Sequence, residues 1–162
     1  MTPGALPRRR AIAGAAIALL LPLLAGCSLL EGPSPETPPR ASAPAPEIAP
    51  ELVPGGTAEE NLPYFTEVLR TYTAGEGPVQ GAPIVQAVTD AGFDPALMQV
   101  SFDRTKTNLD ADNIFVSVRA GAECLIGQVV AADRSFVAVT EPAVGPQQDI
   151  CLIGTTAPIA GQ

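Results

Sequence analysis

The sequence predicts an α+β domain, in which two N-terminal helices pack on a four- to five-stranded antiparallel sheet. Two stretches between residues 57 and 92 repeat apolar residues at three- and four-residue intervals, which is the period of a helix. From Met98 onward, short runs alternate between apolar and polar residues, which is the period of a strand. Helices that precede the strands, instead of alternating with them, favour an antiparallel sheet covered on one face.

The first helix is predicted to start at a capping box, because Thr57 is followed three residues later by Glu60, and to end near 74–75. Pro63 cannot donate a backbone hydrogen bond. Either the first turn is therefore irregular, or the helix proper starts with Asn61 as its N-cap and Pro63 in the first turn. One apolar stripe recurs with the helical period; it consists of Leu62, Phe65, Val68, Leu69 and Tyr72.

A second, shorter helix is predicted over about 83–91. Gly92 suits the left-handed position that follows a helix, and Phe93 would then pack back on Val88, as in a Schellman motif. Asp94, which is followed by a proline, is expected to cap one further helical turn.

Five strand-like runs follow, separated by turn residues. The tetrapeptide Cys-Leu-Ile-Gly occurs twice, starting at Cys124 and at Cys151. We expect these two segments to be neighbouring strands that end in glycine and whose cross-link fixes their register, since a slip by one residue would exchange the two faces. The predicted strands cover 98–102, 114–119, 124–130, 136–140 and 150–153.

The N-terminal stretch resembles a bacterial lipoprotein signal. Three arginines at 8–10 precede an apolar run over 11–24, and the run ends in Leu-Ala-Gly-Cys at Cys27. A membrane-spanning helix is the alternative, but about 20 apolar residues are needed to cross a bilayer, and this run is shorter and contains Pro22. We therefore expect residues 1–26 to be removed as a signal peptide.

Cys27 would then become the mature N-terminus and carry a diacylglycerol group, which would hold the protein at the extracytoplasmic face of the cell membrane. The arginines are not followed by the pattern Ser-Arg-Arg-x-Phe, so export by the general secretory route is favoured over the twin-arginine route. Residues 27–56 are rich in Pro, Ala and Glu, which predicts an extended linker of up to about 80 Å. The linker is either a spacer through the cell wall or a tether of no specific length. The single α+β domain is expected over 57–162.

The charge of the chain excludes one class of function. Nine Lys and Arg residues oppose seventeen Asp and Glu residues, and removal of Arg8, Arg9 and Arg10 with the signal would change the net charge from −8 to −11. Nucleic-acid binding depends on clustered Lys and Arg, so we expect no nucleic-acid partner. Anionic lipid headgroups would also repel the chain, which leaves the acyl chains as the membrane contact.

Two cysteines remain once Cys27 is assigned to lipid. Outside the cytoplasm, an even pair favours a disulfide between Cys124 and Cys151. A metal site is the alternative, but the chain has no histidine, and two thiolates fall short of the usual four zinc ligands. Closing a loop of about 27 residues would stabilise the domain by about 3 to 4 kcal/mol.

The sequence offers little for catalysis. Without histidine, the Ser-His-Asp and Cys-His arrangements are excluded, and Lys106, the one lysine, lies in a polar stretch. Paired carboxylates such as Asp110 and Asp112 are the remaining acid–base candidates. The segment 108–113 imitates the start of a calcium loop but has Arg119 where the bidentate glutamate belongs. We expect a polar connection here, no metal, no cofactor and no enzymatic activity.

Several segments together resemble an actinobacterial family of small lipoproteins with an uncharacterised domain: 61–65, 91–94, 112–119 and the two Cys-Leu-Ile-Gly segments. The resemblance covers 57–159. The strand over 115–119 departs slightly from the Phe-Ser-Val-Arg pattern of the family, and Pro158-Ile159 is not followed by a tryptophan. The resemblance implies a cell-envelope location and paired cysteines, but no activity.

We therefore expect a non-enzymatic, membrane-anchored binding or assembly module of the cell envelope. The signal, the linker and the disulfide-stabilised domain without catalytic side chains favour this function, and the partner would be another envelope protein or a cell-wall component. An envelope enzyme that uses carboxylates, or a structural or stress-related envelope protein, is the alternative. An exposed apolar patch or an uncovered sheet edge would favour binding.

Overall fold

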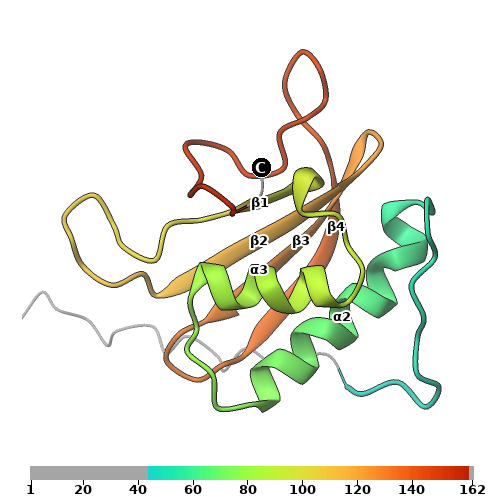
Figure 1. Ribbon diagram of the computed structural model, residues 1–162, viewed down its shortest axis with the longest axis horizontal. Helices are drawn as coiled ribbons and strands as arrows, with labels where there is room; N and C mark the ends of the chain where they lie inside the picture. Colours follow the sequence, from blue (N-terminus) through green and yellow to red (C-terminus); the bar gives the residue numbers. More distant parts are fainter. Residues whose placement is uncertain (1–43, 161–162) are drawn as a thin grey trace, which may run out of the picture. The chain divides into compact units, whose positions relative to one another are not determined.

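The computed structural model describes residues 44–160, so the predicted signal, Cys27 and the first part of the linker lie outside the described residues. The observed architecture confirms the α+β prediction: two helices pack on one face of a four-stranded antiparallel sheet of order β1-β2-β3-β4 (Figure 1). Within the described part, no helix is long and apolar enough to cross a membrane. The elements are α2 (Ala58–Ala74), α3 (Gly81–Asp90), the short 3-10 helix η2 (Pro95–Leu97), β1 (Met98–Val100), β2 (Asn113–Ala120), β3 (Glu123–Val130) and β4 (Phe136–Pro142).

The capping box at the start of α2 is confirmed. The Glu60 backbone N–H donates to the Thr57 hydroxyl at 3.1 Å, and the Thr57 N–H donates to the Glu60 carboxylate at 2.8 Å. The Thr57 hydroxyl also donates to this carboxylate, at 3.1 Å. The hydrogen bond from the Thr57 backbone N–H, and after it the one from the Thr57 hydroxyl, lower the pKa of the Glu60 carboxyl. The alternative with Asn61 as N-cap is wrong, and Pro63 lies inside the helix. Asn61 instead binds the backbone of Val53 in both directions, at 2.9 and 3.0 Å.

Arg134 closes the other end of α2. Its Nε donates to the carbonyl of Thr73 at 2.8 Å, and its two terminal nitrogens donate to the carbonyls of Gly77 and Tyr72 at 2.6 and 3.1 Å. The last carbonyls of a helix lack intrahelical partners and carry partial negative charge, so a guanidinium is a favourable partner for them. This contact fixes the end of α2 against the turn between β3 and β4.

The second helix begins at Gly81, two residues before the predicted start, because the Asp103 carboxylate accepts a hydrogen bond from the Gly81 N–H at 2.6 Å. Its end follows the prediction. Gly92 has φ +98°, and the Phe93 N–H donates to the Val88 carbonyl at 3.3 Å, which is the Schellman geometry.

The core lies between the helices and the sheet. Alternate residues of the strands point toward the helices and are buried, while α2 covers β3 and β4 and α3 covers β1 and β2. Leu52 also packs on this core, ahead of the first helix. One continuous core and both cysteines of the disulfide lie within 52–160, which is what a domain needs to fold alone. Core side chains include Phe65, Leu69, Ile84, Val88, Ile114, Val116, Leu125 and Val129.

Two strand predictions are wrong. The first strand ends at Val100 instead of 102, and Phe102 is exposed beyond it. The predicted strand at 150–153 is a series of bends with a single bridge, between Ile150 and Val144. It does not pair as a strand because the Cys151 N–H donates to the Gln99 side chain and not to a neighbouring strand. Consequently the disulfide joins β3 to a loop, and the first Cys-Leu-Ile-Gly segment continues through its glycine inside β3.

Candidate functional site

The second face of the sheet, opposite the helices, is partly apolar. Strand alternation places Ser117, Ile126 and Val139 in one row across β2, β3 and β4 on this face, with Phe115 in the next row. Ser117 is fully buried, whereas Phe115 and Val139 keep 36% and 38% of their surface exposed. The face is therefore covered at one end and open at the other.

The cover is the C-terminal strap, which we define as residues 143–157. The disulfide between Cys124 and Cys151, with an S–S distance of 2.02 Å, joins it to β3 and confirms the predicted pairing. The Gln99 side-chain oxygen accepts hydrogen bonds from the N–H groups of Cys151 and Leu152, both at 2.8 Å. The Ala157 N–H donates to the Val100 carbonyl of β1 at 2.8 Å. In Figure 1 the strap is the red segment that leaves β4 and returns beside β1.

An apolar hollow of about 370 Å³ lies between the strap and the open part of the sheet. No charged residue lines it, and the polar side chains of its lining are those of Ser101, Thr155 and Thr156. Ile153 forms part of the rim and is 90% exposed, which is unusual for a branched aliphatic side chain. Gly154, with φ +109°, turns the chain directly after it. The lining residues are Ser101, Phe115, Ile126, Cys151, Leu152, Ile153, Thr155 and Thr156.

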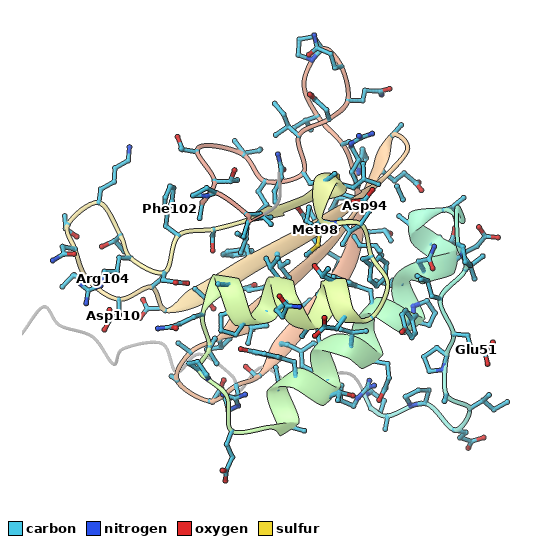
Figure 2. The ribbon with its side chains drawn as sticks, in the orientation of Figure 1. Glu51, Asp94, Met98, Phe102, Arg104 and Asp110 are labelled. Atoms are coloured by element: carbon cyan, nitrogen blue, oxygen red, sulfur yellow. A yellow bond between two sulfur atoms is a disulfide. The ribbon has the colours of Figure 1, made fainter. Side chains whose placement is uncertain are left out.

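The segment 108–113 lies in the long loop between β1 and β2. Asp110 forms an ion pair with Arg104 at 3.3 Å, and Arg104 also donates to the Asn108 side chain at 2.9 Å. Figure 2 shows Arg104 and Asp110 next to each other on this loop. Asp110 is thus engaged by a cation of its own loop. Within 44–160 no cluster of three or more acidic or cysteine side chains is arranged to hold a metal ion.

Two other carboxylates of the domain, Glu60 and Asp103, have contacts that stabilise helix ends. Glu60 is bound by the start of α2, and Asp103, which lies close to Arg104 and Asp110 in a polar depression, accepts the hydrogen bond from Gly81. These contacts give Glu60, Asp103 and Asp110 structural partners in the fold.

Sequence reasoning did not predict the apolar hollow. A signal was present, because Phe115 and Ile126 are apolar residues at positions that alternate with the buried ones, so β2 and β3 carry apolar side chains on both faces. A strand exposed to water on one side normally places polar residues there. Of the predicted site residues, Cys151 lines the hollow, and its disulfide partner Cys124 lies in β3. Cys27 lies outside the described residues.

A protein-family model described as a domain of unknown function (DUF6993) matches residues 69–155. The chain belongs to this family. The match runs from the middle of α2 through the sheet and into the C-terminal strap, so the disulfide and most of the apolar hollow lie within the family domain. No curated protein and no solved structure matches the chain.

Proposed function

We propose that this chain is a non-enzymatic docking module of the bacterial cell envelope, in which a lipid on Cys27 holds the domain at the membrane and the apolar hollow receives a partner protein. The supporting observation is the hollow itself. An open, uncharged depression of about 370 Å³ beside a 90% exposed isoleucine leaves apolar surface in water unless something covers it. The lipoprotein-like signal supports the location.

The chemistry of the hollow favours a protein segment over a cell-wall polysaccharide. A sugar polymer carries many hydroxyl groups, each of which loses free energy if it is buried without a hydrogen bond. The side chains of the wall offer a sugar polymer only the three hydroxyls of Ser101, Thr155 and Thr156. The rest of the wall, including Phe115, Ile126 and Leu152, offers only apolar side chains. Aliphatic side chains of a partner protein match such a wall better.

The edge of the sheet supports docking less well than the hollow. The Val130 N–H donates to the Ser135 carbonyl, and the Ala143 N–H donates to the Ala122 carbonyl, so in this register Pro142 points its backbone nitrogen away from β3. A proline at an outward position cannot donate to an added strand, and it limits the length of the edge. β1, at the other edge, is only three residues long.

Site-specific photo-crosslinking in intact cells tests the proposal. A benzophenone-bearing amino acid replaces Ile153 in the full chain, and a matched chain carries it at Ile48, which is 85% exposed on the segment before α2. We expect a protein adduct from position 153 and none from position 48. A chain that reaches the membrane, but gives no protein adduct from position 153, contradicts a docking role for the hollow.

A further inference from the structure

We infer that the partner in the apolar hollow is a second copy of this chain, docked about a two-fold axis so that Ile153 of each protomer enters the hollow of the other. This inference rests on the proposed docking function and names its partner. It follows from the shape, the charge and the extent of the surface around the hollow.

The first argument is shape. A two-fold interface requires one surface patch to be complementary to itself. Here a projecting aliphatic side chain, Ile153, stands at the rim of an unfilled apolar depression on the same face of the same molecule. An apolar cavity of about 150 Å³ can hold a benzene molecule, and an isoleucine side chain has fewer carbon atoms than benzene. The hollow of about 370 Å³ therefore has room for the Ile153 side chain of a partner copy.

The second argument is preorganisation. The disulfide at Cys151 and the two hydrogen bonds to Gln99 fix the backbone directly before Ile153, and Gly154 sets the turn directly after it. A side chain that is held in place before binding loses less conformational entropy on binding. The strap therefore presents Ile153 in the same position in every copy, as a symmetric contact requires.

The third argument is charge. Without the signal the chain would have a formal net charge of −11, so a basic partner would be recognised through carboxylates around the docking surface. None of the residues that line the hollow is charged. Two copies can therefore meet at this face without placing like charges in direct contact, and the screening length of about 8 Å at physiological salt weakens the repulsion between the carboxylates farther away.

The extent of the surface predicts a weak dimer. The exposed apolar side chains of this face are few, namely Ile153 and the partly exposed Phe115 and Val139, whereas a standard interface buries roughly 800 Å² per partner from about 20 to 30 residues. Small interfaces of this kind are transient in solution. Attachment to the membrane by a lipid would raise the effective concentration of the two copies and favour their association there.

Sedimentation equilibrium on residues 44–162, at protein concentrations between about 0.1 and 1 mM, measures the association. We expect a reversible monomer–dimer equilibrium. Ile153→Glu should weaken the association at least about tenfold, because it would place a carboxylate in the hollow. The matched variant Ile48→Glu changes the same residue type at similar exposure on another surface, and it should dimerise like the parent chain. Both side chains are exposed, so thermal unfolding should be unchanged in both.

A mixture of two further variants tests the reciprocal contact. Ile153→Lys and Thr155→Glu should each be monomeric alone, because each places a charge in both hollows of a dimer. When the two are mixed, one hollow of the heterodimer keeps Thr155 and receives an unchanged Ile153, with the Ile153→Lys change only at its rim, and the other hollow places the lysine of one chain beside the glutamate of the other. The mixture should therefore dimerise. If the two substitutions acted only by making the surface less hydrophobic, the mixture would stay monomeric.

Two outcomes would overturn the inference. A parent chain that stays monomeric up to about 1 mM, or an association that Ile153→Glu leaves unchanged, excludes a second copy in the hollow. The photo-crosslinking result then separates this failure from that of the docking function. An adduct from position 153 with a different envelope protein keeps the docking function and replaces the partner, whereas no adduct removes both.

Discussion

Gly127 lies in the middle of β3, where Leu69 and Phe65 of α2 pack directly on the strand. A Cβ atom placed on it would lie 2.5 Å from Leu69 Cδ1 and 3.2 Å from Phe65 Cζ. Both side chains are fully buried, so neither can move into solvent to make room. The absence of a side chain at this residue therefore sets the distance between α2 and the sheet.

We expect Gly127→Ala to destabilise the domain by about 1 to 3 kcal/mol, because overpacking forces the buried neighbours off their preferred rotamers. The urea midpoint of residues 44–162 measures the change. Gly77→Ala is the matched control, because a Cβ at Gly77 meets no atom within 4 Å and its backbone has no positive φ. The control should change the free energy of unfolding by less than about 0.5 kcal/mol. Equal urea midpoints for the two variants would contradict the prediction, because they would show that the core accommodates a methyl group at Gly127 without loss of stability.

At the scale of elements, the sequence predicted the helix ends correctly where neighbouring residues determine them. The capping box at Thr57 and the stop at Gly92 are formed by residues within a few positions of each other, and both were readable in the sequence. The strap was not predictable in this way. Its backbone at Cys151 is held by Gln99, which lies 52 residues earlier in the chain. The apolar residues at 150–153 suggested a strand because periodicity does not report such long-range partners.

The disulfide connects the strap to β3 across a sequence separation of 27 residues. A closed loop of this length restricts the unfolded chain, so reduction should lower the stability by about 3 to 4 kcal/mol. In a domain of this size, that loss corresponds to a fall in the melting temperature on the order of 15 °C. Thermal unfolding of residues 44–162 with and without reductant measures it, and the mass should rise by two hydrogens on reduction.

The double variant Cys124→Ala, Cys151→Ala is the control for side effects of the reductant. Its melting temperature should match that of the reduced parent chain and should not respond to reductant. A parent chain with the same melting temperature before and after complete reduction would contradict a stabilising role of the disulfide.

At the scale of the whole molecule, the sequence predicted the layers better than the surface. The order of two helices before the strands was enough to place both helices on one face of an antiparallel sheet. The apolar hollow depends on where the strap stops covering the second face, and that boundary is set by the Cys124–Cys151 and Gln99 contacts together. Composition and spacing do not encode such a boundary. The sequence therefore predicted a binding function, but not the surface that would bind the partner.

The location of the molecule gives the last prediction, which concerns Cys27. The sequence before the domain resembles a lipoprotein signal, and the first residue seen to pack on the core is Leu52. Residues 52–159 form a continuous core among themselves, so Cys27→Ala should leave the folding of the domain unchanged while it removes the attachment point of the lipid. We expect the variant in the soluble fraction of lysed cells and the parent chain in the membrane fraction. Ser28→Ala, at the neighbouring position, should fractionate like the parent chain. A Cys27→Ala variant that still fractionates with membranes would show that the N-terminal apolar run, or another part of the chain, attaches the protein without a lipid.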